Sequence, residues 1–308
     1  MPAFAPKNIA IVSALMLAPF CPAQASHPAG AKAASTEQQV SPPDIHAPLP
    51  AAAVIKQRVL ENLKKMKVEQ ERYICHVART REETDKHGNI KKGDVRDYDM
   101  FFVNGREIDE LVAKNGKTLD ASQQKKEAGR VKTEIEKDSD EKRVAKEQAD
   151  DEKQLDTILH ALRYTNGRRQ IVHGRSTLFY DLSGDPSFHP KNVQETFLHN
   201  MSGTIAIDEL TGELVDLNAL LDHDVKIGGG LLANVHKGLW IHIHQIRQPD
   251  GVWISDLVEG KGDARAALFL HPYFQFKQTT SSCHLTDVTT QTGAGTVVDP
   301  ASGSVKTD

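Results

Sequence analysis

The second half of the chain alternates short strand-like runs with turn signals, and this pattern constrains the fold more than any other feature of the sequence. The runs are rich in apolar and β-branched residues, and turns such as Pro249-Asp250-Gly251 and Gly260-Lys261-Gly262 separate them. Strands at this spacing favour a meandering antiparallel sheet, and so many strands tend to curl towards a barrel. The predicted strands of this half are 168–182, 201–208, 213–221, 222–227, 231–236, 239–247, 251–259, 265–278 and 279–286.

The first half of the chain adds helices and three more strands. An amphipathic helix is predicted where apolar residues recur at helical spacing, at Ile55, Val59, Leu63 and Met66. A second amphipathic helix is predicted over 154–164. The predicted strands are 72–84, 96–104 and 106–113, and Asn104-Gly105 is a hairpin turn signal between the last two. Together these elements predict the α+β class, with a large curved antiparallel sheet (a half-open barrel) and a few helices covering one face, over residues 51–288.

Residues 120–153 are almost all charged or small. Charges of both signs at helical spacing predict a solvated helix, broken near Asp138-Ser139-Asp140. The alternative interpretation is that this charged surface docks a partner. Solvated helix faces usually have this composition, so the first interpretation is favoured.

Several predicted strands are apolar on both faces and therefore need cover on both. We expect the helices to cover one face. The other face is expected to line an apolar ligand cavity, with Trp240, Trp253, Leu257 and Phe269 as its candidate residues. A second packed layer is the alternative, and the sequence leaves that choice open.

Residues 1–25 have the features of an export signal. Lys7 precedes an apolar run over 9–18, and Ala23-Gln24-Ala25 matches the small-x-small pattern that signal peptidases cut after. The run is shorter than the roughly 20 residues that a helix needs to cross a bilayer. We therefore expect a periplasmic protein, cleaved near Ala25, with no transmembrane anchor in its mature form.

Two further segments are predicted to lie outside the folded domain. Residues 26–50 are rich in Ala, Pro and Ser, which is typical of a flexible linker. Residues 289–308 have few large apolar side chains and predict a disordered tail.

The cysteines predict one disulfide bond. Lipidation of Cys21 is not expected, because the bulky Phe20 precedes it where a small residue is usual. Cys75 and Cys283 then form the even pair that is typical of exported proteins. Their bond would tie the first strand to the last, and two separate buried thiols are the alternative.

Other motifs exclude several classes of function. The net charge is −4, without a broad basic face for nucleic acid. The glycine run Gly228-Gly229-Gly230 lacks phosphate-loop spacing, because Lys237 is followed by Gly238 and not by Ser or Thr, so no nucleotide is expected. The Gly-x-Ser-x-Gly motif of serine hydrolases is absent from the sequence. We expect no cofactor and no catalytic residue, and hence a non-enzymatic protein.

His242 and His244 are weak candidates for a metal site. Residues two apart on a strand project from the same face, and paired imidazoles are common zinc ligands. The sequence shows no third ligand at a recognisable spacing, so ordinary polar packing is favoured over zinc.

Five stretches together resemble a bacterial family of uncharacterised exported proteins: Phe102-Val103-Asn104-Gly105-Arg106, Gln123-Gln124-Lys125-Lys126-Glu127, Asp185-Pro186-Ser187-Phe188-His189-Pro190, Met201 to Asp208, and Val225 to Gly238. That family is similar to periplasmic carriers and sorting proteins of outer-membrane lipoproteins. The resemblance covers about residues 55–285 and implies a half-open antiparallel barrel with helices over its mouth. The family usually has Trp where Ala206 stands, and it supplies no catalytic motif.

The resulting hypothesis is a periplasmic carrier or binding protein for an acyl chain, a lipid or a lipoprotein. The alternative is an envelope structural or interaction protein that docks through residues 120–153. A zinc-dependent enzyme that uses His242 and His244 is the third hypothesis.

Overall fold

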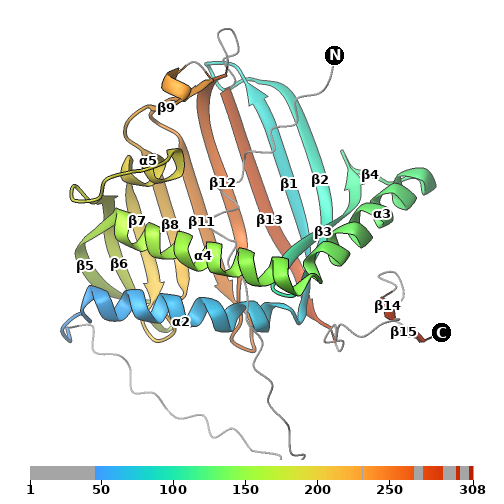
Figure 1. Ribbon diagram of the computed structural model, residues 1–308, viewed down its shortest axis with the longest axis horizontal. Helices are drawn as coiled ribbons and strands as arrows, with labels where there is room; N and C mark the ends of the chain where they lie inside the picture. The colour runs from blue at the N-terminus through green and yellow to red at the C-terminus, as the bar shows by residue number, and fades with distance from the viewer. Residues whose placement is uncertain (1–45, 231, 267–272, 287–295, 299–304, 308) are drawn as a thin grey trace, which may run out of the picture.

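One open antiparallel sheet organises the molecule, and helices pack against it (Figure 1). The computed structural model describes residues 46–230, 232–266, 273–286, 296–298 and 305–307. The helices within these residues are α2 (Ala52–Gln70), α3 (Ala121–Asp138), α4 (Glu141–Ala161), α5 (Val193–His199) and the 3-10 turn η1 (Gly228–Gly230). The strands are β1 (Tyr73–Thr84), β2 (Ile90–Val103), β3 (Arg106–Lys114), β4 (Lys117–Thr118), β5 (Leu162–Val172), β6 (Arg175–Gly184), β7 (Met201–Asp208), β8 (Leu214–Leu221), β9 (Val225–Ile227), β10 (Ala233–Val235), β11 (Trp240–Arg247), β12 (Trp253–Ala266), β13 (Tyr273–Leu285), β14 (Thr296–Val298) and β15 (Val305–Thr307).

The order of strands across the sheet is β4-β3-β2-β1-β13-β12-β11-β8-β7-β6-β5, with β10 pairing to β12 and to β9. This arrangement confirms the predicted α+β class and the large antiparallel sheet. The sheet stays open, because β4 and β5 stand at its two ends and do not pair with each other in the described part of the chain. The predicted export signal at 1–25 lies outside the described residues, as do most of the linker at 26–50 and most of the tail at 289–308.

Three predictions of strand boundaries were wrong. The predicted division between 278 and 279 is absent, because β13 runs unbroken from Tyr273 to Leu285, and glycines explain the other two. The predicted strand 168–182 is a hairpin, because His173 and Gly174 take left-handed φ values of 48° and 75° and turn the chain between β5 and β6. The predicted turn at 260–262 instead lies inside β12. A Cβ atom on Gly260 would lie 2.7 Å from both the Phe276 ring and the Trp240 carbonyl oxygen, so glycine permits close packing there.

The face of the sheet under α4 is apolar. Ile205, Leu217, Ile243 and Val258 form one row of paired residues across β7, β8, β11 and β12. Paired residues share a face of an antiparallel sheet, and we call this face the inner face. In Figure 1, α4 crosses the sheet and α2 lies along the lower ends of the strands. The row belongs to a cluster of buried apolar side chains that forms the main core of this half of the sheet.

The charged segment 120–153 forms α3 and the first part of α4, divided at Ser139 and Asp140 as the charge pattern predicted. The separate helix predicted over 154–164 was wrong, because α4 continues unbroken to Ala161 and residues 162–164 belong to β5. The side chain of Asp120 caps the first turn of α3 by accepting a hydrogen bond from the backbone N–H of Gln123. The side chain of Asp140 accepts one from Arg143 at the start of α4. Each helix therefore has its own start signal, which fixes the position of the break.

Helix α3 protects the edge of β3. Glu127 Oε1 accepts a hydrogen bond of 2.8 Å from the Leu111 backbone N–H, and Arg130 donates to the Asp109 carbonyl. These groups of β3 would otherwise be free to pair with another strand. Val131 of α3 also packs with Val103 and Ile108. Part of the charge in this segment is therefore used within the fold.

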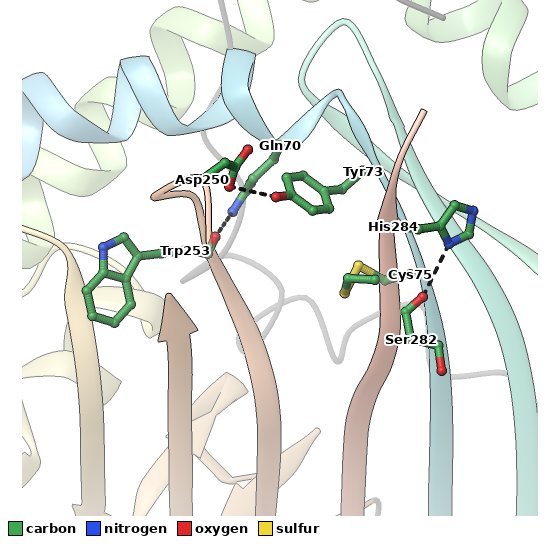
Figure 2. The surroundings of a disulfide bond; sticks show 8 residues. Gln70, Tyr73, Cys75, Asp250, Trp253, Ser282 and His284 are labelled. Carbon is green, nitrogen blue, oxygen red and sulfur yellow. Dashed lines mark hydrogen bonds between the residues drawn. A yellow bond between two sulfur atoms is a disulfide. The ribbon is translucent and has the colours of Figure 1, made fainter. Parts of the chain in front are cut away.

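A disulfide bond joins Cys75 in β1 to Cys283 in β13, with Cα atoms 4.1 Å apart, as the sequence predicted. Figure 2 shows its surroundings, in which Tyr73 donates a hydrogen bond of 2.6 Å to Asp250. Burial, followed by this carboxylate, raises the pKa of Tyr73 to about 12. Nearby, Gln70 of α2 donates to the Trp253 carbonyl. The bond therefore lies where α2, β1, β12 and β13 meet.

We expect the double variant C75A/C283A to lower the free energy of unfolding by about 2–5 kcal/mol, because the bond closes a loop across a sequence separation of 208 residues. Urea unfolding followed by circular dichroism measures the loss. Wild-type protein treated with dithiothreitol should match the variant. Equal stability of the variant and the oxidised wild type would contradict the prediction.

We expect E127A to lower the free energy of unfolding by about 1–2 kcal/mol, because it leaves the Leu111 N–H without its acceptor. The matched control is E136A on the exposed side of α3, which should stay within about 0.5 kcal/mol of wild type. The same urea titration compares the two variants, and an equal effect of both would rule out a specific role for the edge contact.

Candidate functional site

Two small apolar cavities lie between the inner face and the helices. The first, which we call the α2 cavity, has a volume of about 60 Å³ and lies between α2, α4 and strands β5 to β8. Its principal apolar lining residues are Ile55, Val59, Leu159, Tyr164, Ile205 and Leu214. The second has about 30 Å³, and its lining includes Ile158, Leu162, Leu198, Met201, Leu217 and Ile241. The two cavities mark where packing of helix on sheet is incomplete.

The α2 cavity forms where the apolar stripe of a helix faces the inward-pointing residues of a strand. Ile55 and Val59 are one helical turn apart and face the sheet, where Ile205 and Ile207 project inward from alternate positions of β7. One charged side chain lies among these residues. The Lys56 ammonium stands 5.6 Å from the centre of the Tyr164 ring, a cation–π distance. The site thus combines an apolar interior with one cation.

The volume of the α2 cavity limits what it holds in this conformation. Pockets that enclose drug-sized ligands have roughly 300–1,000 Å³. At about 60 Å³ the α2 cavity accepts only the end of an alkyl chain. Binding a long acyl chain there requires α2 or α4 to move away from the sheet.

The opposite face of the sheet, the outer face, carries a polar network. Trp240 and His242 alternate with the inward-facing Ile241. His242 hydrogen-bonds to Asp216 at 2.8 Å and to Glu259 at 3.3 Å, on the strands at either side. Burial of the ring opposes protonation, but the two carboxylates outweigh it, and the pKa of His242 is raised. The His242 ring therefore links β8, β11 and β12 through hydrogen bonds.

The two candidate zinc ligands are held by different carboxylates. His244 hydrogen-bonds to Asp256 at 2.6 Å, whereas His242 lies between Asp216 and Glu259. Among the residues that the structure describes, no three His, Cys, Asp or Glu side chains are arranged to hold a metal ion. The network fits a structural role, in which charge and hydrogen bonds join β8, β11 and β12.

The structure places three of the four predicted ligand-lining residues, Trp240, Trp253 and Leu257, outside the lining of both cavities. Trp240 stands on the outer face, where its indole N–H donates to Asn218. Trp253 is buried in a cluster with Met66 of α2. Leu257 pairs with His244 in the sheet register, and Phe269 lies outside the described residues. The residues that do line the α2 cavity also follow sequence patterns. These are the helical repeat of apolar residues that begins at Ile55 and the alternation of apolar residues within 201–208.

Comparisons with protein-family models, curated proteins and solved structures found no match for this chain. The resemblance to lipoprotein carriers therefore stays a prediction. No helix among the described residues is both long and apolar enough to cross a membrane.

We expect the His242 imidazole to titrate above pH 6.5, and D216N to lower its midpoint by removing one favourable carboxylate. The folded state favours the charged ring. Its contribution to stability is therefore fully present below the unfolded pKa and is lost as pH rises through the folded pKa. Two-dimensional NMR of the imidazole protons measures the midpoint, with E134Q as the control. An unchanged midpoint in D216N would contradict this.

Proposed function

We propose that this protein is a non-enzymatic carrier or binding protein for an acyl chain, a lipid or a lipoprotein. The observation that carries the proposal is the α2 cavity, where apolar residues of two helices and four strands converge. An apolar cavity between separable layers suits a greasy ligand, because the alkyl chain replaces contacts that the lining residues lack.

The Lys56 ammonium supports a ligand with an anionic or polar head. It is the charged side chain among the lining residues of the α2 cavity, and it stands over the Tyr164 ring. Long cationic side chains commonly lay their stem along apolar surface and keep the charge in water. A fatty acid or an acidic lipid would thus place its tail in the cavity and its head near Lys56.

The periplasm is the proposed compartment. A structural disulfide is typical of oxidising environments, and Cys75–Cys283 is such a bond. The export signal read in residues 1–25 supports the same compartment. Lipids and lipoproteins cross the periplasm in water and need shelter for their acyl chains.

We expect V59F to weaken binding of an acyl chain at least about tenfold, because the larger ring occupies the α2 cavity. The matched control is V54F on the same helix, whose side chain is exposed and should leave affinity within about twofold. Titration with the fluorescent fatty acid cis-parinaric acid measures both affinities. Mass spectrometry of lipids extracted from protein purified out of the native envelope tests for a resident ligand. Wild-type protein that neither binds the probe nor carries lipid would overturn the proposal.

A further inference from the structure

Helix α2 packs on residues 208–213, which are the last residue of β7 and the turn that leads to β8. Arg58 of α2 donates a hydrogen bond of 2.6 Å to the Glu209 carbonyl oxygen. A Cβ atom on Gly212 would lie 2.8 Å from the Arg58 carbonyl carbon and 2.9 Å from the Val59 nitrogen. Only glycine permits this approach, so the helix backbone lies directly on the turn. Gly212 and Val59 also line the α2 cavity.

Two carboxylates in residues 208–213 have hydrogen-bond or ion-pair partners. Asp208 is 1% exposed and accepts hydrogen bonds from Arg175 and from the Thr211 backbone and hydroxyl. Glu209 is paired with the buried Arg169 at 2.6 Å. Burial raises the pKa of Asp208, but the hydrogen bonds from Arg175 and Thr211 outweigh it and hold that pKa below its usual range.

Glu213, at the end of the same turn, differs from both. Its side chain is 3% exposed, and its Oε1 atom has no hydrogen-bond partner among the described residues. An ionised carboxylate is costly to bury without a full set of partners, so this environment favours the neutral form of Glu213.

The charges around Glu213 favour the neutral form. Asp208 on its own turn and Glu69 on α2 are acidic neighbours. The cation on α2 that faces it, Lys65, is 70% exposed and pairs with Glu69 at 3.5 Å. On β6, Arg175 forms an ion pair with Asp208. Burial first, then Asp208 and Glu69, raise the pKa of Glu213 to about 8.

We propose that Glu213 is a proton-controlled latch: its protonated form keeps α2 on the sheet, and loss of the proton releases α2 and opens the α2 cavity. When α2 leaves, water reaches the Glu213 carboxylate, and the apolar lining that includes Ile55 and Val59 is uncovered. That a lipid then enters rests on the proposed function; the latch itself does not.

The sign of the effect follows from proton linkage. Closed protein holds the Glu213 proton up to about pH 8, whereas a solvated carboxyl loses it near its ordinary value of 4.5. Closed protein therefore binds more protons between these two values. The ratio of open to closed molecules rises by up to about tenfold per pH unit in this range and levels off above it.

Hydrogen exchange of the α2 amides, residues 52–70, tests the latch in the full chain. After correction for intrinsic exchange, the protection of α2 should fall by up to about tenfold per unit between pH 6 and pH 8. The variant E213Q, which carries no titrating proton, should show no such fall, and amides of β1 should show none in either protein. E61Q, on the exposed side of α2, should behave as wild type. An E213Q profile that falls like that of wild type would overturn the latch.

The Glu213 midpoint and the rate of probe binding can also be measured directly. Carboxyl carbon NMR of the wild-type protein should place the Glu213 midpoint well above 4.5, and a midpoint at the ordinary value would also overturn the latch, even if E213Q did not fold. Stopped-flow binding of cis-parinaric acid should speed up from pH 6 to pH 8 in wild type and not in E213Q. If α2 protection depends on Glu213 but the probe never binds, the proposed function fails and the latch stands.

Discussion

The pairing of β1 with β13 is the contact on which the rest of the structure depends. Strands β4 to β1 come from the first half of the chain, and strands β13 to β5 come from the second half. Among the described strands, the β1–β13 pair alone joins the two sets, through a register that runs from Tyr73–Leu285 to Thr84–Tyr273. The Cys75–Cys283 bond fixes one end of that pair. The sheet is therefore continuous because the two most distant strands of the domain meet near its middle.

Such a long-range pairing is entropically demanding, since the loop must close before the contacts form. The disulfide relieves that cost by limiting the unfolded chain. Around it, Tyr73, Asp250 and Gln70 link β1, the β11–β12 turn and α2 through hydrogen bonds. The disulfide, the hydrogen bonds and a buried apolar cluster therefore all stabilise the contact between the two halves of the sheet.

The helices cover two different parts of this sheet, its edge at β3 and its inner face. Helix α3 covers the edge of β3 with Glu127 and Arg130, which blocks edge-to-edge association. Helices α2 and α4 cover the inner face, and their packing leaves the α2 cavity. The backbone of α2 also packs on Gly212 of the β7–β8 turn, next to the buried Glu213, whose Oε1 atom has no hydrogen-bond partner among the described residues. The same helix therefore covers the apolar site and packs on the turn that carries Glu213.

Local patterns in the sequence determined the α+β class, the antiparallel sheet, the capped break at Ser139 and Asp140 and the choice of Cys75 and Cys283 as partners. Each depends on residues close in the chain, or on there being only two cysteines to pair. Tertiary structure alone decided that Gly260 serves close packing, that Trp240 faces outward and that Ile55 and Ile205 line one cavity. These outcomes depend on strand order, register and the placement of helices on the sheet, and these arise from contacts between segments far apart in the chain.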